Sequence, residues 1–521
     1  MKHPGEKHFN HTMSEVAELF HVAPVTVLNW VREGLLELDG DRLVTEDSLL
    51  KFKKRYAGKV KLQARANKQL KDGHDDDEVG RIIREALRTE PFDFSLGDRY
   101  EAMLSESYKN KEGVFYTPAS IVDDMMREVE VDADTLFLDP CCGSGNFLVK
   151  ALEKGVKPQN LYGFDTDPNA IAIACQRIKA LTGCEAPHVV CADFLQVCPT
   201  LKVRFNMVFT NPPWGKKLTK AQRDSYAQCY QAGASNDTCS LFLLSSLSVL
   251  QRDGVIGLLL PDSFFKIAVF EDARKTVLQQ TVLKMKDYGK PFKNMYSAVS
   301  LVLKKHKSDH EHSVVCCYNQ SRYCRSQRSF ALMPRHNLNY WTSPDEMRLV
   351  EELLCHPYLT LKGHATWSLG IVTGNNAAMC RRSQRKGYKP VYRGKDILPG
   401  RLKAATLFVN PEDFPRYQQM ASLELLCAPV KLVYRFISSS LVFYCDKHQR
   451  YILNSANMLV LDGDFPLDAK ELAEIMNSRL TNWLFRQLFN THKILRSDLE
   501  MLPIITDSAL HRRFNLLDFG G

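Results

Sequence analysis

The residues best suited to chemistry form the run Asn211-Pro212-Pro213-Trp214, which directly follows an apolar stretch at 205–210. The stretch predicts a buried strand, and the two prolines end it and remove two backbone donors. The carbonyl of Pro212 is then expected to lie unpaired beside the amide of Asn211. These two oxygens could accept both hydrogens of one planar amino group while Trp214 stacks on its ring. The simplest alternative is a turn that merely ends a strand.

A glycine-containing turn lies upstream, between a predicted strand at 136–138 and a predicted helix that begins at Asn146. Gly143 and Gly145 allow a tight turn in which a ligand can approach backbone amides. The turn lacks both the three-glycine spacing of dinucleotide-binding loops and the lysine of a phosphate loop. An acid, Asp139, ends the strand instead. Because a carboxylate would repel a pyrophosphate, the turn favours a ligand with an ammonium group.

Two further predicted strands also end in acids. The strand at 161–165 ends at Asp165, where an α/β fold places a carboxylate for ribose hydroxyls. The next strand, beginning at His188, ends at Asp193 and is followed by Phe194. This acid could accept a hydrogen bond from an adenine amino group, and the aromatic ring could stack on the adenine. A single Asp at a strand end is more often a helix cap, but three acids in register with the glycine turn indicate a shared ligand site.

In this order the motifs resemble those of S-adenosylmethionine-dependent amino methyltransferases, and in particular the gamma class of N6-adenine DNA methyltransferases, the TaqI-like group. The resemblance begins near residue 110 and runs to the end of the chain. Two positions depart from the usual motifs, because Cys141 replaces a common alanine and Trp214 replaces the commoner tyrosine. Cys141 is still small and Trp214 still offers a stacking face, so neither change removes a needed group.

The resemblance implies an α/β fold: a Rossmann-like class I methyltransferase sheet with helices on both faces. It implies that this domain binds S-adenosyl-L-methionine and acts on an adenine flipped out of double-stranded DNA. The residues that it places around the cofactor are Tyr116, Thr117, Pro118, Asp139, Pro140, Cys141, Gly143, Gly145, Phe147, Asp165, Asp193, Phe194 and Phe242. It places Asn211, Pro212, Pro213 and Trp214 at the reacting amino group. It places Trp214 and Phe292 against the flipped base, although Phe242 and Phe292 could equally be ordinary core residues.

Residues 1–56 are expected to form a separate helix-turn-helix domain. A capping box at Thr12 and Glu15 begins one helix. Pro24 suits the first position of a second helix, which Gly34 would end. Two short helices joined by a short turn are typical of a helix-turn-helix, and the segment is similar to MerR-like and excisionase-like proteins. The alternative is a small helical hairpin that packs against the enzyme or a partner.

Three further segments follow. Residues 57–80 are expected to be a charged linker, residues 81–310 the methyltransferase domain, and residues 311–521 an α+β domain that resembles the TaqI-like target-recognition domain. Between 374 and 450, fourteen Lys and Arg stand against five Asp and Glu, an excess of nine that equals the net charge of the whole chain. Such an excess suits contacts with DNA phosphates, although a solvated β-rich surface is the alternative. The basic residues expected to contact DNA are Arg381, Arg382, Arg385, Lys386, Arg393, Lys395 and Arg435, interleaved with Tyr388, Tyr392, Tyr434 and Phe436.

The cysteines and the chain's hydropathy bear on location and partners. The 15 cysteines include no C-x-x-C pair, which indicates free thiols in the cytoplasm and no metal site. The beginning of the chain is charged and polar, so no signal peptide is expected, and no apolar run approaches the ~20 residues of a membrane span. The expected partner is double-stranded DNA, as the resemblance implies, and no contact with a membrane is expected. A separate restriction nuclease is a further candidate partner, because the chain shows no evident nuclease motif.

Other functions use part of the same chemistry. Cytosine-N4 methylation needs nearly the same site, though serine is more typical there in place of Asn211. Methylation of RNA or of a protein glutamine also uses Asn-Pro-Pro-aromatic motifs, but the long basic C-terminal region argues against a small protein substrate. A non-catalytic DNA-binding regulator on the same scaffold is the remaining alternative, and the intact acids and motif argue against it.

Overall fold

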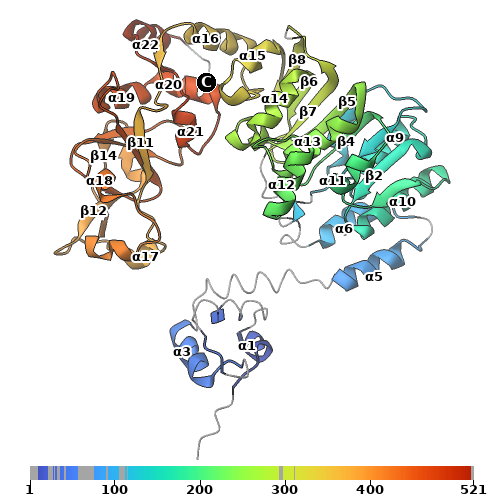
Figure 1. Cartoon of the computed structure of the whole chain (residues 1–521), viewed down its shortest axis with the longest axis horizontal. Helices are drawn as coiled ribbons and strands as arrows, with labels where there is room; N and C mark the ends of the chain where they lie inside the picture. The colour runs from blue at the N-terminus through green and yellow to red at the C-terminus, as the bar shows by residue number, and fades with distance from the viewer. Residues whose placement is uncertain are drawn as a thin grey trace, which may run out of the picture. The chain divides into compact units, whose positions relative to one another are not determined.

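The computed structural model of the chain describes residues 10–20, 27, 30–31, 36–39, 43–56, 76–89, 92–104, 109, 112–113, 115–292, 297–309 and 311–517. The chain divides into two compact units. The first unit consists of Met1–Ala232, Asn236–Leu260 and Pro291–Met295, and the second of Gly233–Ser235, Pro261–Lys290 and Tyr296–Gly521. Figure 1 labels many of the helices and strands of both units.

Parallel strands form the centre of the first unit. They are β1 (Phe137–Asp139), β2 (Leu161–Asp165), β3 (His188–Cys191), β4 (Phe205–Thr210) and β5 (Leu250–Pro261). Their order is β3-β2-β1-β4-β5, and β1 pairs in parallel with both β2 and β4. The central strands are almost continuously apolar and buried, as expected for a parallel sheet covered on both faces.

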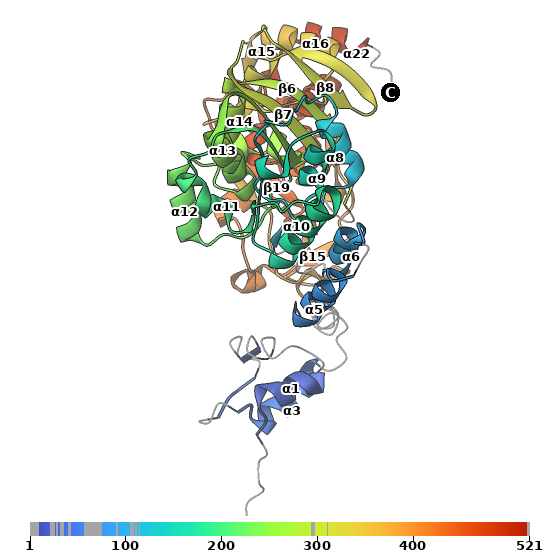
Figure 2. The same ribbon diagram turned by 90° about the vertical axis from the view of Figure 1, so that its right-hand side faces the viewer.

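Helices cover both faces of these strands. The helices after β1 and β2 are α9 (Asn146–Glu153) and α10 (Pro168–Thr182), and those between β4 and β5 are α12 (Lys220–Cys229) and α13 (Thr238–Val249). The chain moves outward from β1 in one direction and from β4 in the other, so right-handed crossovers place the two sets of helices on opposite faces. Figure 2 shows α9 and α10 on one side and α12 and α13 on the other. The predicted α/β class and the helices on both faces are confirmed.

Four further helices belong to the first unit. They are α5 (Asp76–Ala86), α6 (Leu96–Met103), α8 (Ala119–Met126) and α11 (Phe194–Val197). α5 begins inside the segment that the sequence predicts to be a linker, and residues 57–75 of that segment lie outside the described residues. The strand order reverses between β1 and β4. In open α/β sheets, ligands bind beyond the carboxyl ends of the strands at such a reversal.

The beginning of the chain has its own small core. It contains α1 (Met13–Phe20) and α3 (Glu46–Tyr56), with Val27, Trp30 and Val31 also helical. The predicted capping box is present, because Thr12 N–H donates to Glu15 Oε2 at 2.7 Å and Glu15 N–H donates to Thr12 Oγ1 at 3.2 Å. Pro24 and Gly34, the predicted limits of the second helix, lie outside the described residues. The helix-turn-helix therefore stays a prediction.

The second unit combines a mixed sheet with an α+β region. The mixed sheet has β7 (Ala298–Lys307), β6 (Gln280–Asp287), β8 (Ser313–Tyr318) and β9 (Ser321–Ser326) in that order. A four-stranded antiparallel sheet follows, in the order β11 (Ala365–Leu369), β19 (Ala456–Leu461), β16 (Lys431–Arg435) and β17 (Phe443–Asp446). Smaller sheets join β15 (Leu407–Val409), β12 (Lys389–Tyr392) and β18 (Tyr451–Ile452); β13 (Ile397–Leu398) and β14 (Arg401–Leu402); and β10 (Tyr358–Leu359) and β20 (Ile504–Ile505).

The helices of the second unit pack mainly around its C-terminal sheets. They are α14 (Glu271–Gln279), α15 (Arg328–Ala331), α16 (Pro344–Leu354), α17 (Asn376–Met379), α18 (Leu423–Leu426), α19 (Ala469–Met476), α20 (Arg479–Leu488), α21 (Arg496–Leu499) and α22 (Ser508–Asn515). One apolar core joins α16, α19, α20 and α22 to the four-stranded sheet, and a second lies around β12. The predicted α+β character of this region is confirmed.

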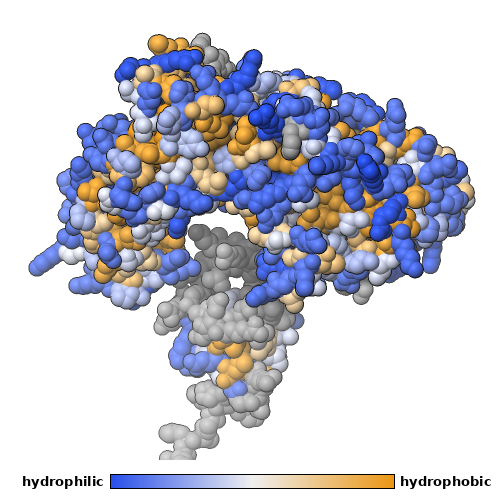
Figure 3. All heavy atoms as spheres, turned by 45° about the horizontal axis from the view of Figure 1, so that its top comes forward, coloured by the Kyte–Doolittle hydropathy of each residue, from blue (hydrophilic) through white to orange (hydrophobic). Residues whose placement is uncertain are grey.

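Three further properties bear on function. No helix within the described ranges is both long and apolar enough to cross a membrane. All 15 cysteines are described and none forms a disulfide. Among the described residues, no group of three or more His, Cys, Asp or Glu side chains could hold a metal ion. On the face drawn in Figure 3, hydrophilic residues cover most of the surface and hydrophobic ones form small groups.

Candidate active site

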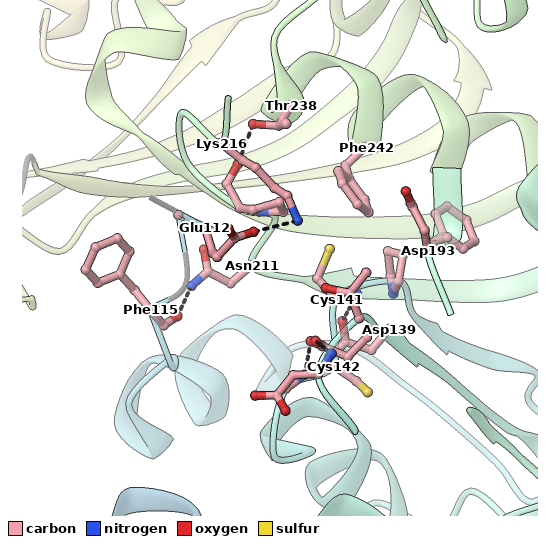
Figure 4. Close-up of a pocket in the computed structure, with 18 of the residues that line it drawn as sticks. Glu112, Phe115, Asp139, Cys141, Cys142, Asp193, Asn211, Lys216, Thr238 and Phe242 are labelled. Carbon is pink, nitrogen blue, oxygen red and sulfur yellow. Dashed lines mark hydrogen bonds and ion pairs between the residues drawn. The ribbon is translucent and has the colours of Figure 1, made fainter. Parts of the chain in front are cut away.

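A pocket of about 1040 Å³, including its part open to solvent, lies where β1, β2, β3 and β4 end in the first unit. Figure 4 shows Asp139, Asp193 and Asn211, from the ends of β1, β3 and β4, converging on it. The predicted cofactor residues that line it are Tyr116, Thr117, Asp139, Pro140, Cys141, Gly143, Phe147, Asp165, Asp193, Phe194 and Phe242. Asn211 and Pro213 line it as well, whereas Pro118, Gly145, Pro212, Trp214 and Phe292 do not. The structure therefore brings most of the predicted residues to one place.

Two positions in the turn between β1 and α9, Gly143 and Gly145, require glycine for different reasons. Gly143 adopts φ of +50°, and a Cβ there would lie 2.4 Å from Cε1 of Tyr116. Its N–H donates to Oδ2 of Asp165 at 2.9 Å, so the turn is tied to the end of β2. Gly145 adopts φ of +89° directly before α9, and a Cβ there would meet Ala174 at 3.1 Å. Gly143 therefore shapes the pocket wall, while Gly145 shapes the entry into α9.

Asp139 supplies a buried carboxyl to the pocket. Its side chain is 1% exposed, and burial raises its pKa to about 7. The backbone N–H of Cys141 donates to its Oδ1 at 3.1 Å, which opposes this rise only in part. A buried carboxyl with so little compensation gains most from a cation placed beside it. The site therefore fits the ammonium group of a ligand, as its position after β1 predicts.

Asp165 and Asp193 are each held by backbone amides. Asp165 accepts from Gly143 and from Asp167, both at 2.9 Å, and burial raises its pKa. Each of its oxygens keeps a lone pair for a ligand hydroxyl. Asp193 caps α11 by accepting from Leu195 N–H at 3.0 Å, and it lines the pocket as well. The helix-cap alternative for Asp193 is thus correct, and it does not exclude contact with a ligand.

Phe194 and Phe242 form one wall of the pocket. Their rings are stacked, with centroids 6.1 Å apart and an interplanar angle of 21°. Two rings that enclose a third lie about 7 Å apart, twice a carbon–carbon contact distance. An adenine therefore cannot lie between them in this arrangement and would contact the pair from the pocket.

Within the described part of the chain, the side-chain amide of Asn211 is bonded at only one of its two polar atoms. Its Nδ2 donates to the carbonyl of Phe115 at 2.7 Å, which fixes the orientation of the amide. Its Oδ1 is buried and accepts no hydrogen bond from any described residue. Thr238 Oγ1 donates to the carbonyl of Pro213 at 2.6 Å, whereas no described residue donates to the carbonyl of Pro212. Two adjacent acceptors are therefore unused, and leaving a buried one unsatisfied costs about 1–3 kcal/mol.

Trp214 and Phe292 occupy a different arrangement from the one the resemblance implies. Trp214 is 7% exposed, and its indole N–H donates to the carbonyl of Leu259 at 3.2 Å. Its ring meets that of Phe292 edge-on, with centroids 5.5 Å apart and an angle of 82°. Phe115 completes the cluster, at 5.5 Å from Phe292. No flat slot separates Trp214 from Phe292, so their contact with a base stays a prediction that requires one ring to move.

Several pocket residues are absent from the predicted set. Glu112 and Lys216 form an ion pair of 3.0 Å in which both side chains line the pocket. Thr238 lies at the first turn of α13, well beyond the motif in the sequence. Asn146 accepts from Arg177 at 2.7 Å and donates to the carbonyl of Thr117 at 2.9 Å. Lys216 lies two positions after the motif and could have been found there, whereas the others reach the pocket only through the fold.

The predicted DNA-contacting residues of the second unit fall into two groups. Three are engaged within the protein: Arg381 donates to the carbonyl of Ala378, Arg393 pairs with Asp396 at 2.9 Å, and Arg435 donates twice to the carbonyl of Ile397. Arg382, Arg385, Lys386 and Lys395 are exposed, and none has an ion-pair partner among the described residues. The second group is the one free to contact phosphates.

Two of the interleaved aromatic residues cannot act as the sequence predicts. Tyr392 is 8% exposed and Tyr434 is 1% exposed, so both belong to the apolar cores. Neither ring can therefore insert into a groove of DNA, because the end of β12 and nearly all of β16 are buried. Lys431 is also fully buried, in an ion pair of 3.1 Å with Asp446. Its charge does not contribute to a surface for DNA.

Comparisons with known proteins show which family the chain belongs to. Residues 93–340 match the family model described as N-6 DNA Methylase, and residues 389–504 match the TaqI-like C-terminal specificity domain. The chain is 41% identical over 389 residues to the Type II methyltransferase M.VspI of Vibrio sp. (strain 343), covering 74% of this chain and 95% of that protein. It is 25% identical to the Type I restriction enzyme EcoEI methylase subunit of Escherichia coli, over 39% of this chain and 44% of that one.

A solved structure shows the same fold at low identity. The Type IIL restriction-modification enzyme MmeI, solved in complex with DNA, matches with a TM-score of 0.52 and 10% identity, over 78% of this chain and 70% of that chain. The family match, the specificity domain and the long alignment to M.VspI confirm the predicted methyltransferase and its TaqI-like C-terminal domain. The chain therefore belongs to the N-6 DNA methylase family and is a DNA methyltransferase of the restriction-modification type.

Proposed function

We propose that this enzyme transfers a methyl group from S-adenosyl-L-methionine to N6 of an adenine that has been flipped out of double-stranded DNA. The observation that carries the proposal is the buried Oδ1 of Asn211, which has no partner among the described residues although its amide is fixed by Phe115. An adenine amino group offers two N–H donors in one plane. The Asn211 oxygen and the unused carbonyl of Pro212 are two acceptors next to each other in the chain.

The pocket residues suit the methyl donor, which supplies a methyl group on a positively charged sulfur. Asp139, whose pKa burial raises to about 7, would pair with its ammonium group. Asp165 has free lone pairs for the ribose hydroxyls, and Asp193, Phe194 and Phe242 would hold the adenine ring.

The chemistry then depends on two oxygens of this chain. By accepting both hydrogens of the amino group, Asn211 and Pro212 draw its lone pair out of conjugation with the ring and direct it at the methyl carbon. The carbon–sulfur bond breaks as the carbon–nitrogen bond forms, and the positively charged nitrogen then releases one proton. No covalent bond to the enzyme is needed. Orientation and preorganised electrostatics provide the rate increase.

The same proposal assigns roles to the rest of the chain. The exposed cations of the second unit would hold DNA while its specificity domain reads the sequence, as the TaqI-like resemblance implies. Residues 1–56 would form a helix-turn-helix that adds DNA affinity. We assign the enzyme to the gamma class and to the cytoplasm, where it would meet chromosomal DNA, with a separate nuclease as the partner that cuts unmodified DNA.

Mass spectrometry of the product tests the base assignment directly. Purified enzyme is incubated with S-adenosylmethionine carrying a deuterated methyl group and with genomic DNA from cells that lack the gene. N6-methyladenine with the label is the expected nucleoside, and N4-methylcytosine would overturn the adenine assignment. The variant Asn211→Ala serves as the negative control. Sequencing the modified DNA then gives the recognition motif.

A further inference from the structure

A run of cations follows the Asn-Pro-Pro-Trp motif in the first unit. Lys216, Lys217, Lys220 and Arg223 lie within eight positions, and the first acid after them is Asp224. Lys217, Lys220 and Arg223 are exposed, and none of the three has an ion-pair partner among the described residues. Concentrated, uncompensated positive charge of this kind attracts a polyanion. It lies next to the residues proposed to do the chemistry, and not in the specificity domain.

The first cation of the run reaches the pocket itself. Lys216 is the only basic side chain among the described residues that line it. Its ammonium lies 3.0 Å from the carboxylate of Glu112, and the two side chains are 29% and 23% exposed. Figure 4 shows this pair beside Asn211. The pair is only partly buried, so an incoming anion can reach the ammonium group, and exchange of one anionic oxygen for another would leave Lys216 paired.

A flipped nucleotide brings phosphates to this edge of the pocket. If the adenine amino group meets Asn211, the sugar and its two phosphates must remain near the pocket mouth, because the base is covalently attached to them. A phosphate and a carboxylate both offer an anionic oxygen to an ammonium group, with similar hydrogen-bond lengths. Glu112 therefore occupies Lys216 in the way that a backbone phosphate would.

We propose that the DNA strand carrying the target base lies along the run 216–223, and that Lys216 leaves Glu112 to bind a phosphate of the flipped nucleotide. Glu112 then acts as a competitor that holds the lysine in place until DNA arrives. The proposal rests on the proposed function and deepens it. It adds a substrate-binding surface within the first unit to the sequence-reading surface of the specificity domain.

Variants of the two partners give opposite results under this proposal. Lys216→Met removes the bond to the phosphate and should weaken binding of a duplex carrying the mapped motif by about fivefold, the upper end for an exposed ion pair. Glu112→Gln frees Lys216 and should strengthen binding by a similar factor or less. Binding is measured by fluorescence anisotropy of the labelled duplex. A pair that only supports the fold would instead give two variants that both bind more weakly.

Two readouts separate phosphate binding from a general loss of structure. The slope of log affinity against log salt should fall by about 0.9 in Lys216→Met, as expected when one phosphate is no longer neutralised, and should not fall in Glu112→Gln. With 2-aminopurine at the target position, fluorescence from the flipped base should decrease in Lys216→Met. The pair Lys179–Glu185, separated by 2.7 Å and outside the pocket, is the matched control. Lys179→Met and Glu185→Gln should change neither readout.

The outcomes distinguish the inference from the proposed function. Equal weakening in both variants, or no change in either, would overturn the role of Lys216 while the wild-type enzyme still methylates adenine. Absence of N6-methyladenine from the wild-type reaction would instead overturn the proposed function itself. Replacing Lys217, Lys220 and Arg223 together by glutamine tests the rest of the run. An unchanged salt slope in that variant would remove the run from the DNA path.

Discussion

The first prediction concerns Asn211, whose side-chain nitrogen and oxygen differ in their hydrogen bonding. Its Nδ2 donates to the carbonyl of Phe115, whereas its Oδ1 accepts no hydrogen bond from the part of the chain that the structure describes. Asn211→Ala should reduce single-turnover methyl transfer by roughly 10²–10³-fold, the effect of removing one preorganised polar group from a reacting centre. Binding of S-adenosylmethionine and DNA should persist, because Asn211 acts on the amino group.

The control for this prediction is Asn160→Ala. Asn160 also donates from its side chain to a backbone carbonyl, that of Ala133 at 2.9 Å, but it does not line the pocket. Methyl transfer should be unchanged in that variant. Full single-turnover activity in Asn211→Ala would contradict the mechanism.

Asp139 gives the second prediction, which concerns pH. Its pKa of about 7 in the ligand-free protein should fall when a cationic ammonium group binds beside it, so binding releases a proton. The affinity for S-adenosylmethionine should therefore rise with pH up to about 7, by at most tenfold per unit, and level off above it. Calorimetry in two buffers with different ionisation heats measures the released proton. Binding that is independent of pH between 5 and 8 would contradict this role.

The third prediction concerns the same carboxyl and stability. A folded-state pKa raised to about 7 means that the stability contribution of Asp139 is present below its unfolded pKa near 4 and is lost as pH rises through 7. Asp139→Asn removes this loss while keeping the shape of the side chain. At pH 8 without ligand, the variant should unfold a few degrees above the wild type and bind S-adenosylmethionine less tightly. An unfolding temperature below that of the wild type would show that the charged form is stabilised.

At the scale of elements, the turn between β1 and α9 gives the fourth prediction. Gly143→Ala should abolish most cofactor binding, because the new Cβ meets Tyr116 at 2.4 Å and the backbone has a positive φ. Gly183→Ala is the matched control, since Gly183 also has a positive φ, +71°, but nothing lies within 4 Å of its Cβ position. The control should lose some stability to backbone strain and keep its cofactor affinity by calorimetry. Similar affinities in the two variants would contradict a role for the close approach of Tyr116.

The strands and their ends could be predicted from the sequence because the information is local. The apolar run at 205–210 and the two prolines after it define both β4 and its end. Side-chain partners could not be predicted in the same way. The residues around Trp214 give no sign that its indole donates to the carbonyl of Leu259. Those around Arg435 likewise give no sign that its guanidinium donates to the carbonyl of Ile397. These hydrogen bonds join distant segments, so they depend on the completed fold.

At the scale of the whole molecule, the fifth prediction concerns division of labour. Replacing the exposed residues Arg382, Arg385, Lys386 and Lys395 by glutamine should weaken DNA binding and reduce the salt slope by about 0.9 for each phosphate that is no longer bound. Arg393→Gln is the control, because its guanidinium is occupied by Asp396 and Thr406. That variant should lose stability with little change in slope. An unchanged slope in the fourfold variant would remove these residues from the interface.

Removal of residues 1–56 completes this test. Sequence reading is assigned to the specificity domain, so the truncated enzyme should methylate the same motif with lower overall affinity. Sequencing of DNA modified by the truncated and full-length enzymes measures the motif. A changed motif would transfer sequence reading to the beginning of the chain.

The position of the pocket along the chain also has a consequence for inheritance. Every described residue that lines it lies between Glu112 and Phe242, while the TaqI-like match begins only at residue 389. A single recombination event in the gene, beyond the part that encodes the pocket, could therefore give the enzyme a new recognition sequence without changing its methyl-transfer site. The same event would leave the old recognition sequences unmethylated after the next rounds of replication. A nuclease that still recognised the old sequences would then cut the genome of its own cell. Such exchanges should therefore persist only where the methyltransferase and the nuclease change their recognition sequence together.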